Sequence, residues 1–228
     1  MNRFNNYLKN EFWYGYTLFE KVFMTSMVLL QIIVYCFVPD SIIGMVCGIS
    51  GVICVVLTAK GKLSSYIFNF IQIVTYMYIV WGLGLYLEFL ENIFYFVTCI
   101  VGVFIWKRNM TEETRQVKAK RLTSVHIMMA LVSIVICTFL LGYAGKMYLG
   151  NTLPYYDAFT NVMALAAQLL MIFRYREQWL VWIVIDLVCL VMFFMLGQWS
   201  MVAMYTAWTI NAIYGWYNWS KLNKVETK

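Results

Sequence analysis

The chain is divided into long apolar runs separated by short polar or charged links. Each run is roughly 20 residues long, which as a helix spans the hydrocarbon core of a bilayer. The pattern predicts an all-α integral membrane protein with eight transmembrane helices. Their approximate bounds are 21–38, 41–57, 63–81, 86–106, 124–143, 155–173, 179–196 and 199–219.

Composition supports this class of protein. The chain has 228 residues, of which 63% are hydrophobic and 12% are charged, whereas soluble domains are about 45–50% apolar and about 25% charged. We expect no separate soluble domain and no cleavable signal peptide, because residues 1–20 lack an apolar core. The six cysteines lie in apolar runs without a CxxC motif or a partner histidine, so we expect neither a metal nor another cofactor.

Lysine and arginine occupy alternate links. Of the 17 such residues, 16 lie in the N-terminal tail up to and including Lys21, in the C-terminal tail, or in the links after the second, fourth and sixth runs, and only Lys146 lies elsewhere. Cytoplasmic loops carry such an excess, so both termini are predicted to be cytoplasmic. The net charge of +6 therefore reflects topology and does not indicate a nucleic-acid partner.

The two halves of the sequence align weakly at an offset of 113 to 114 residues. The alignment places Ser65 opposite Trp179, and the Gly-xxx-Trp ending of the fourth run opposite that of the eighth. We expect two parallel three-helix units joined by an inverting fifth helix, a 3+1+3 core of the kind found in transporters, preceded by one extra helix. The predicted divisions are the tail and extra helix (1–40), first bundle (41–107), linker and connecting helix (108–150), second bundle (151–222) and tail (223–228).

The seventh run carries the main candidate site. Trp179, Trp182 and Asp186 are spaced three and four apart, which places them on one helical face. A carboxylate at membrane depth is costly and is usually functional. Two indoles and a carboxylate can hold a flat cationic solute. The alternatives are that Asp186 bonds neighbouring helices and that Trp179 is an interfacial residue.

Other polar or aromatic side chains of the runs complete the predicted binding site. They are Asn211, Tyr214 and Trp208 on the eighth run, Asn69 and Gln72 on the third, and Asn92 and Thr98 on the fourth. Structural readings remain open for two of them: Asn211 as a bond between helices, and Trp208 as a lipid-facing residue.

Three segments resemble the PnuC nicotinamide riboside transporters. They are Leu57-Thr58-Ala59-Lys60-Gly61-Lys62, Trp179-xx-Trp182-xxx-Asp186, and Trp208-xx-Asn211 continuing to Trp219; the resemblance covers roughly residues 41–222. It implies a fold similar to the SWEET sugar transporters and facilitated diffusion of nicotinamide riboside, followed by trapping through cytoplasmic phosphorylation. It further implies the bacterial cytoplasmic membrane. Thiamine, riboflavin or a deoxynucleoside remains an alternative substrate.

We also expect a homo-oligomer, with a trimer as the working assumption. An intramembrane enzyme is the competing class. The sequence has no HExxH, GxSxG or P-loop motif and only one histidine, His126, so we expect no enzyme activity.

Overall fold

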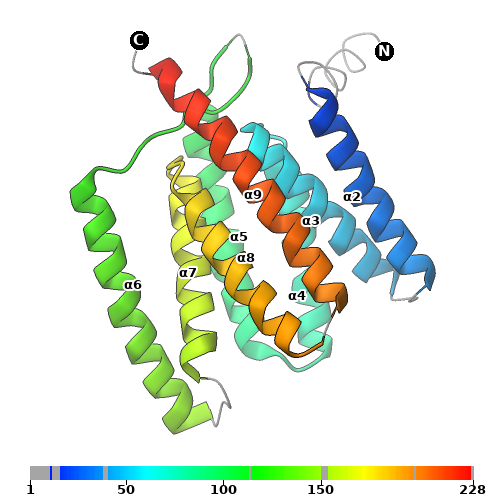
Figure 1. Ribbon diagram of the computed structural model, residues 1–228, viewed down its shortest axis with the longest axis vertical. Helices are drawn as coiled ribbons and strands as arrows, with labels where there is room; N and C mark the ends of the chain where they lie inside the picture. The colour runs from blue at the N-terminus through cyan, green and yellow to red at the C-terminus, as the bar shows by residue number, and fades with distance from the viewer. Residues whose placement is uncertain are drawn as a thin grey trace. The chain divides into compact units, whose positions relative to one another are not determined.

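The computed structural model describes residue 11 and residues 16–37, 41–112, 114–149, 154–197 and 199–226. Within these residues the fold is all-helical (Figure 1). The helices are α2 (Leu18–Phe37), α3 (Ile42–Lys60), α4 (Ser65–Gly82), α5 (Tyr86–Arg108), α6 (Ser124–Ala144), a π-helical turn η1 (Gly145–Leu149), α7 (Pro154–Ile172), α8 (Gln178–Met195) and α9 (Trp199–Glu226). The link at Pro39 and Asp40 between the first two predicted runs, the residue Gln198, and the tail with Arg3 and Lys9 lie outside the described residues.

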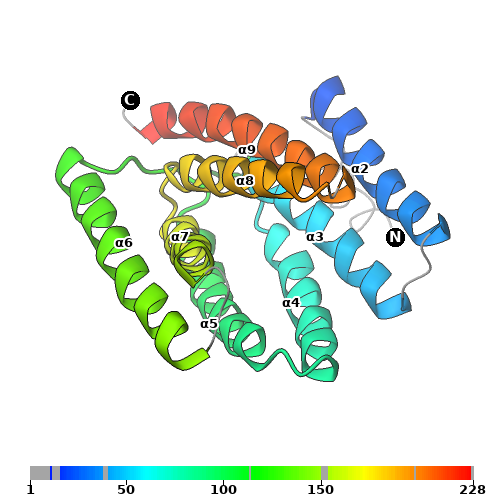
Figure 2. The same cartoon turned by 60° about the horizontal axis from the view of Figure 1, so that its bottom comes forward.

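The helices form two compact units that divide between Val117 and Lys118. In unit 1, α2 packs on α3, α3 on α4, and α4 on α5. In unit 2, α6 packs on α7, α7 on α8, and α8 on α9. The close α8–α9 pair, joined by a short turn, can be followed in both views (Figures 1 and 2). In each unit, every helix therefore packs on the helices next to it in sequence. Helix α4 lies between α3 and α5 in unit 1, and α8 lies between α7 and α9 in unit 2.

The turn between α3 and α4 recurs between α7 and α8. Gly61 ends α3 in the left-handed region at φ 73°, and Arg174, 113 positions later, has φ 70°. The residues that precede α4 and α8, Ser64 and Glu177, also have nearly equal dihedral angles. This geometry pairs Tyr66 with Trp179. The alignment that placed Ser65 opposite Trp179 is therefore wrong by one residue over this stretch.

An aromatic seam joins the last two helices of each unit. In unit 1, Tyr66 lies over Gly102, and its ring meets Trp106 edge-on with centroids 5.0 Å apart. In unit 2, Trp179 lies over Gly215 and meets Trp219 edge-on at 6.1 Å. An added methyl group at either glycine would overlap the aromatic ring, so the absence of a side chain there permits the close helix contact.

Residues 114–122, which we call the strap, bond to these two turns. In unit 1 the Val117 N–H donates to the Gly61 carbonyl at 2.9 Å, and Lys62 Nζ donates to the Thr114 carbonyl at 3.1 Å. Burial lowers the pKa of Lys62. In unit 2 the Lys120 N–H donates to the Arg174 carbonyl at 2.7 Å. The strap thus satisfies backbone groups that the left-handed turns leave outside helices.

The extra helix α2 is attached to α3 by polar and steric contacts. Lys60 Nζ lies 2.6 Å from Glu20 Oε1, and Glu20 is buried. The Lys60 ammonium also lies 5.0 Å from the centroid of the Tyr16 ring. Further along, the Gln31 side chain lies against Gly48. These contacts make α2 an integral part of unit 1.

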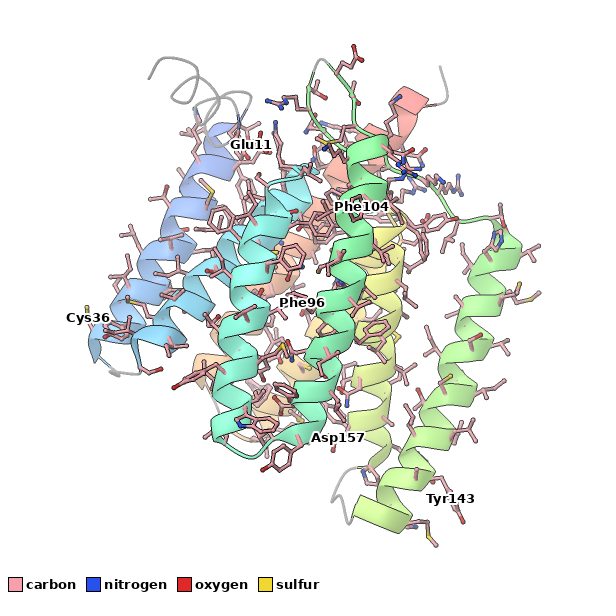
Figure 3. All side chains as sticks on the ribbon, turned by 180° about the vertical axis from the view of Figure 1, so that it is seen from behind. Glu11, Cys36, Phe96, Phe104, Tyr143 and Asp157 are labelled. Atoms are coloured by element: carbon pink, nitrogen blue, oxygen red, sulfur yellow. The ribbon has the colours of Figure 1, made fainter. Side chains whose placement is uncertain are left out.

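Four of the described helices meet a strict criterion of length and hydropathy for crossing a membrane: 42–60, 88–108, 124–147 and 178–195. The others are more polar; α4, for example, carries Asn69, Gln72 and three tyrosines. Most apolar side chains of α6 stand away from its neighbours, and Tyr143 points outward near the end of that helix (Figure 3). Such apolar outer surfaces are typical of an integral membrane protein.

Candidate functional site

Asp186 is the most unusual polar residue of unit 2. It lies near the middle of α8, and only 3% of its surface is exposed. No hydrogen bond or ion pair to its carboxylate is found within the described residues. A buried carboxylate costs several kcal/mol unless a partner compensates it, so Asp186 is suited to pairing with a cationic ligand.

The two tryptophans of α8 lie in different surroundings. Trp182 is half-buried and packs against a core cluster of Met163, Ile185 and Cys189. Trp179 is nearly fully buried in the aromatic seam, over Gly215. Trp179 therefore has a packing role in the seam. Trp182 instead contacts the cluster that contains Ile185 and Cys189, which lie next to Asp186 on α8.

The predicted residues of α9 are arranged along one stretch of that helix. Asn211 is buried, and Tyr214 is half-buried one turn further on. Trp208 is 39% exposed, and its ring meets Tyr205 edge-on with centroids 5.4 Å apart. Unit 2 therefore provides a carboxylate, an amide and several aromatic rings on α8 and α9.

The candidates of unit 1 have bonds inside that unit. Asn69 Nδ2 donates to Cys99 Sγ at 3.0 Å, and Asn92 Nδ2 donates to the carbonyl of Glu88 at 2.8 Å. The Thr98 hydroxyl donates to the carbonyl of Phe94 at 2.9 Å. The Gln72 side chain lies against Gly51, 3.0 Å from where a Cβ would stand. Asn69, Asn92 and Thr98 thus have hydrogen-bond partners inside unit 1, unlike Asp186.

Sequence reasoning missed three residues beside Asp186. Cys189 lies three positions after it on α8, and its thiol receives a hydrogen bond from the Tyr156 hydroxyl of α7 at 3.5 Å. Tyr205 of α9 interacts with the same thiol. The i, i+3 spacing of Asp186 and Cys189 was the available signal, because it places both side chains on the same face.

Two other features do not add to this site. An apolar hollow lies between α4 and α5, lined by Val74, Met77, Ile93 and Phe96, the last of which is labelled in Figure 3. Its lining offers no polar group to a polar ligand. Within the described part of the chain, no three His, Cys, Asp or Glu side chains are grouped closely enough to hold a metal ion.

Comparisons with known proteins identify the family. The sequence profile described as "Nicotinamide mononucleotide transporter" matches residues 41–221. The nicotinamide riboside transporter PnuC of Haemophilus influenzae is 40% identical over 179 residues, which are 77% of this chain and 79% of that protein. PnuC of Neisseria mucosa is 37% identical over 185 residues, which are 78% of this chain and 70% of that protein.

A solved structure agrees with this assignment. The crystal structure of the Vitamin B3 transporter PnuC superposes with a TM-score of 0.80 at 33% sequence identity, covering 96% of this chain and 98% of the other. The resemblance noted in the sequence is thereby confirmed. The chain belongs to the nicotinamide mononucleotide transporter family of membrane transporters, together with the PnuC proteins.

Proposed function

We propose that this chain takes up nicotinamide riboside, a form of vitamin B3 and a precursor of NAD. Its relatives at 37% and 40% identity are nicotinamide riboside transporters. The structural observation that carries the proposal is Asp186, a buried carboxylate with no bonded partner in the described residues. The nicotinamide ring of the riboside bears a fixed positive charge, so it can supply the missing countercharge.

The distribution of charge favours the riboside over the mononucleotide. A phosphate group is usually bound by arginine, lysine or a helix N-terminus. The described helices carry Lys and Arg only within their first or last two turns or in the short π-helical turn η1; these residues are Lys21, Lys60, Lys107, Arg108, Lys146, Lys221 and Lys224. A phosphate at mid-membrane would therefore find no cationic side chain, whereas an uncharged ribose needs none.

The roles of the site residues follow from their surroundings. Trp182 stacks on the nicotinamide ring and Asp186 balances its charge. Asn211 and Tyr214 hydrogen-bond the solute from α9. The candidate residues of unit 1 and the seam residue Trp179 contribute indirectly, by packing around the residues that bind the solute.

The fold and mechanism we propose are those of a transporter built from two parallel repeats. Eight transmembrane helices are arranged as one extra helix and a SWEET-like 3+1+3 core, and the recurring turn and aromatic seam support this duplication. The repeats rock about the solute and expose it to each side in turn. Both termini lie in the cytoplasm of a bacterial cell, where phosphorylation traps the solute. The protein functions as a homo-oligomer.

Binding and uptake by the purified protein test the proposal. Asp186→Asn should weaken nicotinamide riboside binding by at least about ten-fold, because it removes the countercharge while keeping the side chain's shape, a loss of about 1.4 kcal/mol. Trp182→Ala should also weaken binding. Asp157→Asn is the matched control, since this exposed aspartate lies at the start of α7 (Figure 3) and should leave binding unchanged.

The same assay separates the alternatives. The riboside should bind more tightly than nicotinamide mononucleotide, thiamine or riboflavin, and uptake into proteoliposomes should not require a proton gradient. Wild-type affinity in both Asp186→Asn and Trp182→Ala would contradict the proposed site. Preferential binding of another vitamin would contradict the proposed substrate.

A further inference from the structure

Two helices of unit 2 bring tyrosines to one thiol on a third helix. Cys189 on α8 is buried, and the Tyr156 hydroxyl of α7 donates to its sulfur at 3.5 Å. The Tyr205 side chain of α9 packs against the buried cluster that contains Cys189 and interacts with its thiol. Asp186 lies one helical turn before Cys189, on the same face of α8, and Tyr205 interacts with its carboxylate as well. We call Tyr156, Cys189 and Tyr205 the hydroxyl–thiol cluster.

The Tyr205 ring is held in place by neighbouring rings. It stacks on Phe193, with centroids 5.5 Å apart and an interplanar angle of 16°, and meets Trp208 edge-on at 5.4 Å. It also packs against the same core residues as Trp182. These contacts fix the position of the Tyr205 hydroxyl, as is required of a group that binds a ligand selectively.

The thiol is a poor partner for two phenols. Sulfur is only a weak acceptor and the S–H group only a weak donor, whereas each phenol can both donate and accept a hydrogen bond. A ligand with adjacent hydroxyl groups would offer both tyrosines stronger bonds than the thiol does. The bonds that are lost are weak, so exchanging them for oxygen partners is favourable.

We propose that Tyr156 and Tyr205 are specificity-determining residues that bind the ribose hydroxyls of the solute in place of the Cys189 thiol. This inference rests on the proposed function. The geometry divides the solute between two sets of groups: Asp186 and Trp182 bind the charged ring, and the two phenols bind the sugar. Selectivity for a riboside over the free base then comes from the hydroxyl–thiol cluster.

Analogue cycles test this division of roles. Affinities of purified protein are measured for nicotinamide riboside and for its 2′-deoxy and 3′-deoxy analogues, with wild type, Tyr156→Phe and Tyr205→Phe. Each phenylalanine variant should bind the riboside about ten-fold more weakly. Each should bind one deoxy analogue as well as wild type does, because the hydroxyl that its tyrosine contacts is already missing.

The matched control is Tyr95→Phe. It removes a hydroxyl that donates to Glu91 Oε1 at 2.6 Å in unit 1 and should leave the affinities for all three ligands unchanged. Alkylation of Cys189 provides an independent readout in a variant whose other five cysteines are replaced by alanine. Nicotinamide riboside should slow this reaction, since the ligand covers the thiol.

The outcomes separate this inference from the proposed function. If wild type binds no nicotinamide riboside, the proposed function fails and the inference fails with it. If wild type binds the riboside and both phenylalanine variants bind it with the same affinity as wild type, only the inference is overturned. Equal losses for the riboside and for both deoxy analogues would also overturn it, because they would indicate a general packing effect.

Discussion

The aromatic seam of unit 1 makes a quantitative prediction about packing. An alanine Cβ at Gly102 would touch the Tyr66 hydroxyl and would lie 2.8 Å from its Cζ and 2.9 Å from Cε1. Comfortable contacts are about 3.5–4.0 Å, so the ring would have to retreat by roughly 1 Å. Trp106, fully buried and edge-on to Tyr66, blocks that movement.

We expect Gly102→Ala to reduce stability by about 1–2 kcal/mol. Overpacking costs about 1–3 kcal/mol, and the gain in helix propensity from glycine to alanine returns roughly 0.5–1 kcal/mol. A change of this size lowers the melting temperature by about 2–4 °C per kcal/mol in a chain of this length. Thermal unfolding in detergent, followed by tryptophan fluorescence, measures the change.

Tyr66→Phe should rescue much of this loss. The Tyr66 hydroxyl is buried, and no hydrogen-bond partner for it is found in the described residues, so its removal alone should stabilise the protein by about 1 kcal/mol. In the phenylalanine background the nearest obstacle is gone, but Cζ and Cε1 still lie closer than 3 Å to the added Cβ, so Gly102→Ala should cost about 1 kcal/mol less than it does with tyrosine. The double-mutant cycle should therefore show a coupling of about 1 kcal/mol.

Gly82→Ala serves as the control, because no neighbouring atom lies within 4 Å of where its Cβ would stand. It should be neutral or slightly stabilising. If Gly102→Ala were equally costly with tyrosine or phenylalanine at position 66, the hydroxyl would not be the obstacle and the seam argument would be refuted.

Three further predictions concern other buried contacts. Gly215→Ala should lower the melting temperature more than Gly102→Ala, because the added Cβ would lie 2.5 Å from atoms of the Trp179 indole that no simple substitution removes; an equal or smaller effect would count against it. Glu20→Gln should destabilise unit 1 by about 3 kcal/mol, because it leaves the Lys60 ammonium without its carboxylate, and an unchanged denaturation curve would contradict the assigned ion pair. Gln178→Met should raise the melting temperature, because the Gln178 side chain is fully buried and neither amide atom has a bonded partner in the described residues; a lower melting temperature would indicate that the amide is bonded.

The helices were predictable from apolar run length alone, because the hydrocarbon core sets that length. The predicted run 86–106 corresponds to α5, and 124–143 corresponds to α6, within one or two residues. The last run was less well bounded, since α9 continues to Glu226 through polar residues. Membrane thickness limits the apolar part of a helix but not its extension into water.

The register of the duplication could not be read from residue identities. Lys60 and Lys62 match Arg174 and Arg176 by charge, which favours the offset of 114. The structure is organised instead by the left-handed residue of each turn, which is Gly61 in unit 1 and Arg174 in unit 2. Arginine in the left-handed region is uncommon, so no sequence rule would have paired these two positions.

The carboxylate of the candidate site was predictable from the sequence, but the residues around it were not. Asp186 stands out in sequence because a carboxylate in an apolar run is rare. Trp179 shares its helical face, but a helical wheel does not reveal that Gly215 approaches from α9. The tyrosines beside Cys189 were missed for a similar reason: tyrosine is common in this chain, and only the packing of three helices distinguishes these two.

The strap has a practical consequence for dividing the protein. Its hydrogen bonds to Gly61 and Lys62 come from residues 114–117, whereas those to Arg174 come from residues 118–120. A backbone cut between Val117 and Lys118 would leave each of these bonds within a single fragment. Separate expression of fragments 1–117 and 118–228 would therefore show whether each unit keeps its own fold without the other.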